Sequence, residues 1–525
     1  MPSWRRLVVS LFHAGLLSSC EREPVSDDVL FGNRAVYAQA GAAADPPAER
    51  IWRVNAGGMF PSEVHYPAGT GTLTTLLVSE SVDTAGHAFF TSLGTNGRAC
   101  ITCHQPADGM GLSAATARQL WEETQGADPL FAMVDGANCP SLPASDPASH
   151  SLLLERGLIR IPRPWPPLSD DGTPIQPEIS IAVVRDPTGC NTDPVYGLES
   201  AKPTVSVFRR PRPAANLKYA TEIGFSFDPK NGLPLVLDRA TGQPTSGNLL
   251  ADVRQRTLSA QALDALFVHT ERTAPPTAAQ LQQILDFETR IYTAQSFDSR
   301  AGDLTVGAQG GPRALADAPA ARLQSTASNP IWGEFAAWAE PPDPVDPPTG
   351  PLDPQLAHRR SIARGAKLFA GRQFLVTDST GINDTGFGNP VRNSCAFCHN
   401  MLHAGLDVAP GQVDLGTTNF PHATWVWQPD LPLFEVTCKP DAPEHPYLGR
   451  VVLTHDPGYA LTTGKCIDIG KITAQSMRGI AARAPYFANG SAKTLADVIE
   501  FYDQRYEMQL TEEEKLDLLH LLEVL

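Results

Sequence analysis

The sequence predicts a mainly α-helical protein of two domains with long irregular loops. Its 525 residues allow roughly two to four domains at about 150 residues each. Apolar residues recur at helical spacing, whereas the alternating pattern of strands is scarce. The 47 prolines exceed the usual share of about 5%, which favours extended connections between helices.

The start of the chain predicts export. A basic N-terminus precedes an apolar stretch that is too short to span a bilayer. This stretch ends in Leu17-Ser18-Ser19-Cys20, which resembles a bacterial lipobox. We therefore expect a lipoprotein-type signal peptide over 1–20 and a periplasmic protein anchored through lipidated Cys20. The alternative is an ordinary signal peptide cleaved near Ala38-Gln39-Ala40.

Composition divides the rest of the chain into two domains. The stretch 21–50 is rich in small residues and proline, which is typical of a tether. The prolines gathered within 341–354 exclude helix and predict a domain linker. An N-terminal domain over 51–340 and a C-terminal domain over 355–525 remain.

Apolar spacing predicts helices in both domains. One helix follows Thr277, and its apolar face runs on to Ile291 and Tyr292. Another covers 495–502, and a capping box of Thr511 and Glu514 opens a terminal helix over 516–522. Two shorter helical patterns are formed by Ala85, Ala88 and Phe89, and by Ile362, Ala366 and Phe369.

Each short helical pattern precedes a copy of the motif C-x-x-C-H. The copies are Cys100-Ile101-Thr102-Cys103-His104 and Cys395-Ala396-Phe397-Cys398-His399. Two thiols one helical turn apart can add to the vinyl groups of a haem, while the adjacent His binds the iron. We therefore expect two covalently bound haem c groups, held by Cys100, Cys103, His104, Cys395, Cys398 and His399.

The alternatives to haem are a zinc site and a redox dithiol. A zinc site needs four ligands brought together, whereas the two motifs lie in separate predicted domains. A thioredoxin-like dithiol needs a βαβ context, which the sequence does not show. The helix-then-motif order, present twice, predicts two cytochrome c-like haem domains.

Four further cysteines predict disulfides. Cys139 and Cys190 lie before the linker, and Cys438 and Cys466 lie after it. In an oxidising periplasm we expect one bond in each domain, Cys139–Cys190 and Cys438–Cys466. Unpaired thiols are the alternative.

The last third of the chain carries a resemblance to a known family. It reads KITAQSMRGI at 471–480, APYFANG at 484–490 and then a helix that begins Thr494-Leu495. These stretches resemble the closing pattern of the bacterial di-haem cytochrome c peroxidases, in their broad MauG-like branch. The resemblance implies a peroxide-reducing oxidoreductase in which the haem of His399 accepts electrons and the haem of His104 meets hydrogen peroxide.

The resemblance also implies partners and a metal ion. The electron donor would be a small cytochrome c, a cupredoxin or a quinol-linked donor, and many family members are homodimers. A Ca²⁺ commonly lies between the domains, and Gly381-Ile382-Asn383-Asp384 resembles a family loop that could supply oxygens to it. A plain turn is the alternative for this loop.

Distal and sixth-ligand residues follow from the same comparison. Gln255 falls where the family has a Gln, and Glu271 and His269 lie nearby as groups that could move a proton during peroxide cleavage. We take Met477 as sixth ligand of the second haem, although the alignment places Lys471 there. Further sulfur or nitrogen ligands are Met401, His403 and, for the first haem, Met110, with ordinary packing as the alternative for each methionine.

Two departures from the family pattern keep other functions open. The stretch 224–229 has Phe where the family often has a Trp between the haems, and Ala488 replaces the usual His. The alternatives are a pure electron-transfer cytochrome and a MauG-like oxidation of a protein or organic substrate. The net charge of −16 argues against a nucleic-acid partner, and after the signal peptide no apolar stretch is long enough to span a membrane.

Overall fold

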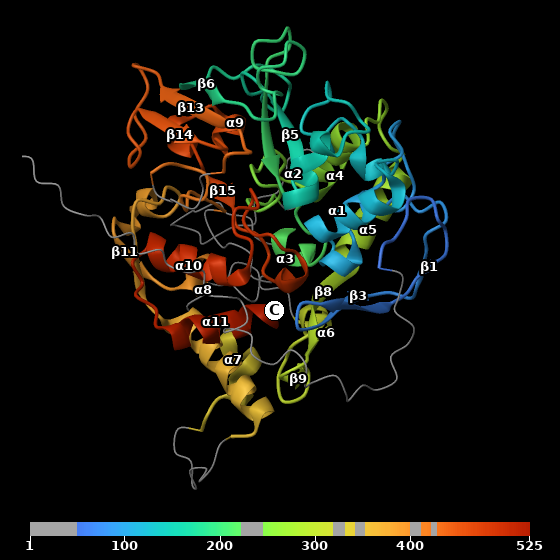
Figure 1. The fold of residues 1–525 in the computed structure, drawn as a ribbon, viewed down its shortest axis with the longest axis vertical. Coiled ribbons are helices and arrows are strands. Elements are labelled where there is room, and N and C mark those ends of the chain that lie inside the picture. Colours follow the sequence, from blue (N-terminus) through green and yellow to red (C-terminus); the bar gives the residue numbers. More distant parts are fainter. Residues whose placement is uncertain (1–49, 222–244, 319–330, 342–351, 400–410, 422–427) are drawn as a thin grey trace, which may run out of the picture. The chain divides into compact units, whose positions relative to one another are not determined.

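The computed structural model describes residues 50–221, 245–318, 331–341, 352–399, 411–421 and 428–525 (Figure 1). The chain from Ala48 to Leu525 forms one compact unit. Several predictions fall outside the described residues: the signal peptide and Cys20, the tether, the stretch 224–229, most of the linker, Met401 and His403.

The fold is mixed α/β, so the prediction of a mainly α protein is wrong. The described residues contain six sheets of two to four strands each. In β2 (Glu63–Ala68) every second residue is buried, which is the alternation expected of a half-buried strand. The strands are short, and several contain only two or three residues. A pattern over so few residues gives a weak signal, which is why sequence reasoning passed over them.

The largest sheet lies in the N-terminal half and has the strand order β2-β3-β8-β9. Its neighbour α5 (Ala278–Arg290) confirms the helix predicted after Thr277 and begins with a capping box of Thr277 and Gln280. Ile291 and Tyr292, expected on that helix, instead begin β8 because they pair with β3. The sheet is completed by β3 (Gly71–Leu77), β8 (Ile291–Asp298) and β9 (Gly302–Asp303).

The helix expected before the first motif is also absent. The segment from Thr84 to Leu93 consists of turns and bends. Gly86 takes a positive φ of 74°, and the Asp83 carboxylate accepts a hydrogen bond from the Ala85 backbone N–H at 2.9 Å. These local bonds compete with helix. Phe89 is nevertheless fully buried.

The C-terminal half contains the predicted helices. α7 (Pro354–Gly371) packs against α11 (Glu512–Glu523), which packs against α10 (Leu495–Arg505) (Figure 1). Capping boxes open both α10 and α11, which confirms the one predicted at Thr511 and Glu514. The terminal carbonyl of Leu525 accepts hydrogen bonds from the backbone of Gly479 at 2.9 Å and of Gln295 at 3.3 Å.

The two halves share structure across the predicted linker. β6 (Ile179–Arg185) pairs with β13 (Leu433–Cys438), which pairs with β14 (Val451–Thr454) in one antiparallel sheet. Arg209 donates to Asp456 at 2.6 and 2.9 Å, and both side chains are buried. The two CxxCH motifs are therefore held in one framework.

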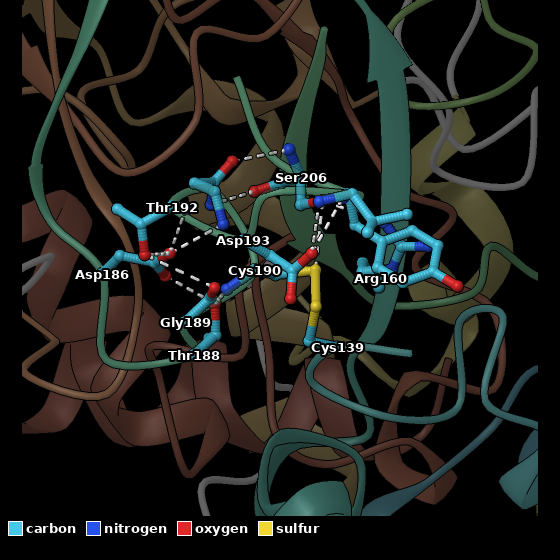
Figure 2. Close-up of a disulfide and its surroundings, with 12 residues drawn as sticks. Cys139, Arg160, Asp186, Thr188, Gly189, Cys190, Thr192, Asp193 and Ser206 are labelled. Atoms are coloured by element: carbon cyan, nitrogen blue, oxygen red, sulfur yellow. Dashed lines mark hydrogen bonds between the residues drawn. A yellow bond between two sulfur atoms is a disulfide. The ribbon is translucent and has the colours of Figure 1, made fainter. Parts of the chain in front are cut away.

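Both predicted disulfides are confirmed. Cys139 bonds to Cys190, and Cys438 bonds to Cys466. Figure 2 shows the first, in a loop ordered by the Asp186 carboxylate, which accepts hydrogen bonds from the Thr188 hydroxyl and from the Thr192 backbone.

Within the described residues, no helix is both long and apolar enough to cross a membrane. The remaining helices and strands are β1 (Met59–Phe60), β4 (Val82–Asp83), α1 (Ala114–Thr124), α2 (Ser151–Arg156), β5 (Ile159–Pro164), β7 (Thr204–Arg209), α3 (Leu217–Thr221), α4 (Leu258–His269), α6 (Pro312–Asp317), β10 (Phe374–Val376), α8 (Cys395–Cys398), β11 (Val391–Asn393), β12 (Gln412–Val413), α9 (Ala460–Thr463) and β15 (Ile472–Thr473).

Candidate cofactor-binding cavities

The first motif forms one tight turn. Cys100–Thr102 is a 3-10 helix, and the backbone N–H groups of Cys103 and His104 both donate to the Cys100 carbonyl, at 3.2 and 3.1 Å. Ile101, fully buried, fixes this turn in the core and donates its N–H to the Phe89 carbonyl at 3.1 Å. The turn therefore presents two thiols and an imidazole from one short segment.

A backbone contact orients His104. Its Nδ1 lies 3.0 Å from the Met110 carbonyl oxygen, to which an N–H at that position donates. Burial lowers the pKa of His104 to about 4. A neutral imidazole held in this way keeps the lone pair of Nε2 for a metal, which is the arrangement that metal-binding histidines commonly show. The Met110 side chain itself is fully buried in the core and does not line the cavity.

Cys100, Cys103 and His104 line one cavity, here called the His104 cavity. It holds about 1370 Å³ of space, its mouth included. Burial raises the pKa of Cys103 to about 12 and that of Cys100 further, so both thiols are uncharged.

An ionisable side chain of α4 faces into the His104 cavity. His269 lines it, and its Nδ1 lies 2.5 Å from the Asp135 carboxylate. Asp135 is fully buried and also forms an ion pair with Arg98, whose Nε donates to the Pro129 carbonyl at 2.8 Å. Burial alone would raise the pKa of Asp135, but Arg98 and His269 outweigh it and lower that pKa. A carboxylate therefore fixes the orientation of His269.

A second ionisable group in this cavity is Glu288 of α5. Its side chain is buried, and none of the described residues forms a hydrogen bond with its Oε2. Burial raises the pKa of Glu288 to about 8, so its carboxyl group is mostly protonated at neutral pH. A protonated carboxyl beside a cavity can hold and deliver a proton.

The second motif forms its own cavity, here called the His399 cavity. Cys395–Cys398 is the short helix α8, and the N–H of His399 donates to the Cys395 carbonyl at 3.0 Å. The two thiols and His399 line about 1510 Å³ of space, its mouth included. The Phe369 ring lies 6.2 Å from the His399 ring, as Phe89 lies 6.4 Å from His104. Both motifs thus have the same aromatic neighbour.

Met477 lines the His399 cavity, as a sixth ligand would require. Lys471 does not line it. The Lys471 ammonium lies 3.2 Å from Asp468 and 3.5 Å from Asp384, the last residue of the loop expected to offer oxygens to Ca²⁺. Asp384 also accepts from the Gly381 N–H at 2.5 Å, which closes the turn. In the part of the chain that the structure describes, no group of three or more His, Cys, Asp or Glu side chains is arranged to hold a metal ion.

The structure does not bring Gln255 or Glu271 into the His104 cavity. Gln255 is half-buried and adjoins the lining residue Arg254 without lining the cavity itself. Glu271 is exposed and has a positive φ of 53°, two residues beyond the end of α4. Their places in the cavity are taken by His269 and Glu288.

The two cavities share part of their wall. Arg210 and Ser476 line both of them. Arg210 follows β7, and Ser476 belongs to the 471–480 stretch. Residues from the N-terminal and the C-terminal half of the chain therefore lie in the wall that the two cavities share.

Sequence reasoning missed Glu288, Arg210 and Arg483 as cavity residues. A signal for Glu288 was present, since it lies four residues after the buried Ile284 on the apolar face of α5. The sequence contains no such signal for the two arginines, because their burial depends on contacts between distant segments.

Comparison with known proteins adds no relative. No family model, no curated protein and no solved structure matches the chain.

Proposed function

We propose that this chain is an exported di-haem c-type cytochrome that reduces hydrogen peroxide at the His104 cavity with electrons received at the His399 cavity. The observation that carries the proposal is the pair of large cavities, each lined by both thiols and the imidazole of one CxxCH motif. When bound, haem would supply one-electron redox chemistry at iron. The proposal agrees with the resemblance to the di-haem peroxidases.

The residues fit haem on two grounds. His104 is neutral and oriented through Nδ1, which leaves Nε2 to bind iron. The thiols of each motif are set one turn apart at the same cavity wall as the imidazole. Cys100, Cys103 and His104 would therefore hold one haem, and Cys395, Cys398 and His399 the other.

The cavities differ in a way that supports a division of labour. The His399 cavity is lined by Met477 and Met508, whose thioethers suit a sixth ligand that raises the reduction potential. The described lining of the His104 cavity contains no methionine but includes His269 and Glu288. Peroxide needs two electrons and two protons to give two water molecules. His269, oriented by Asp135, and the protonated Glu288 are the groups that can hold these protons.

The two disulfides support export to an oxidising compartment. With the lipobox at Cys20, they favour a periplasmic protein tethered to a membrane. The small electron donor and hydrogen peroxide remain the partners that we expect.

The first test measures covalent haem and its reaction with peroxide. The protein is produced in a bacterium that matures c-type cytochromes, and haem per chain is measured by the pyridine haemochromogen assay. We expect two haems per chain, and one in each of the double variants C100S/C103S and C395S/C398S. Stoichiometric peroxide should then oxidise the half-reduced protein within the mixing time of a stopped-flow instrument, and the C100S/C103S variant should lose this reaction.

The main alternative is an electron-transfer cytochrome, and His269 is the observation that favours it. An imidazole lining the His104 cavity could bind iron as a sixth ligand and close the site. Two low-spin haems that ignore peroxide in both the oxidised and the half-reduced state would establish this alternative and refute peroxide reduction.

A further inference from the structure

Two buried arginines lie at the wall that the cavities share. Arg210 is 6% exposed and lines both cavities, and Arg483 is 4% exposed and lines the His399 cavity. Burial is the main cause that lowers the pKa of Arg483, and the charge of Arg210 is the next. The two side chains are therefore close together. The structure thus places two positive groups together in its interior.

Backbone carbonyls are the only hydrogen-bond acceptors that the described residues offer to them. Arg210 donates to the carbonyls of Leu112, at 2.8 Å, and Pro485. Arg483 donates to the carbonyls of Ser476 at 2.6 Å, Arg478 at 3.1 Å and Gly479 at 3.3 Å. The Arg210 Nε, also buried, has no hydrogen-bond partner among the residues that the structure describes.

Among the described residues, most other buried arginines are paired with carboxylates. Arg160 is the exception, since it donates to the Val134 carbonyl and the Ser206 hydroxyl. Arg209 forms ion pairs with Asp252 and Asp456, and Arg478 with Glu334. Among the described residues, neither Arg210 nor Arg483 forms such a pair. A buried charge without a counter-ion costs several kcal/mol, roughly, so proteins rarely keep one.

The buried carboxylate of Asp108 does not supply the missing charge. Asp108 acts on both arginines only at a distance. Its oxygens accept from the Ser113 N–H at 2.8 Å and from Arg50 at 3.3 Å, and burial raises its pKa. Tyr486, also near both arginines, stays neutral because burial raises its pKa to about 12.

The position of Arg483 also links the two sites. A side-chain atom added at Gly111 would lie 3.3 Å from the Arg483 Cδ, and one added at Gly109 would lie 3.7 Å from it. These glycines flank Met110, whose carbonyl orients His104. Arg483 therefore lines one cavity while it packs against the loop that positions the histidine of the other.

We propose that Arg210 and Arg483 bind the carboxylate side arms of the two haems at the shared wall and raise the reduction potentials of both groups unequally. This inference rests on the proposed function, since it requires haem in both cavities. Haem carries its two acid arms on the edge of the ring opposite the vinyl groups that the thiols capture. Arg210, which lines both cavities, acts on both haems, and Arg483 acts mainly on the haem of His399.

The test measures the midpoint potentials of both haems by spectroelectrochemistry. In R210Q we expect reduction of both haems to become at least tenfold less favourable, which is about 59 mV for a one-electron couple. In R483Q we expect that shift for the His399 haem and a smaller one for the other. R256Q is the matched control, because it removes the same charge from an exposed arginine, and it should shift neither potential. R210K and R483K keep the charge and should restore most of each shift.

The outcomes separate this inference from the proposed function. A chain without covalent haem refutes the proposed function itself. A chain with two haems whose potentials move no more in R210Q and R483Q than in R256Q overturns the inference and leaves the function standing. If both Gln variants fail to fold, folding of both Lys variants supports the inference, because the positive charge is then the required feature. If the Lys variants also fail to fold, the inference is overturned, because the arginines are then needed only to bind backbone carbonyls.

Discussion

Replacement of Glu288 by Gln should stabilise the protein increasingly as the pH rises. The Glu288 side chain is 4% exposed, and its Oε2 has no hydrogen-bond partner within the described part of the chain. Burial raises its pKa from 4.5 to about 8. The folded state therefore binds the proton more tightly than the unfolded state. Ionisation of this carboxyl does not lower the free energy of unfolding below pH 4.5. Above that pH the loss of stability grows until the pH passes the pKa of the folded state.

The size of the effect follows from the shift in pKa. At about 1.4 kcal/mol per pKa unit, E288Q should gain about 3 kcal/mol at pH 7 and at most about 5 kcal/mol above pH 8. The assay is urea unfolding followed by far-UV circular dichroism at pH 5, 6, 7 and 8. D286N, which removes a carboxylate from a less buried position on the same helix, is the control. The reasoning is refuted if the difference between E288Q and the wild type is the same at every pH.

Three further predictions concern ligands, protons and the disulfides. M477A should abolish the far-red Met–iron absorption band of the His399 haem and lower its potential, whereas M508A should leave the band intact. H269A should slow the peroxide reaction by about 10²- to 10⁴-fold if the imidazole moves protons; a faster reaction would identify His269 as a blocking ligand. C438S/C466S removes a cross-link between residues 28 apart and should lower the stability by about 3–4 kcal/mol. Thermal unfolding measures this loss, and an unchanged melting temperature would contradict the bond.

The sequence predicted local structure correctly where a few adjacent residues determine it. The capping box at Thr511 and Glu514 and the helix after Thr277 depend on bonds within one turn, so the sequence predicted them correctly. The strands failed for the opposite reason. Ile291 and Tyr292 continue the apolar face of a helix, but their partners on β3 lie more than 200 residues earlier and hold them in an extended conformation.

The sequence by itself determined the two CxxCH motifs, because these depend on residue type and spacing alone. It predicted one disulfide before the linker and one after it but left unpaired thiols open, and the structure decided for the two bonds. Tertiary structure decided which side chains face the cavities. It placed His269 and Glu288 there instead of Gln255 and Glu271, and it buried Arg210 beside Arg483. Burial and the balance of charge are sums over distant segments, so no single stretch of sequence contains them.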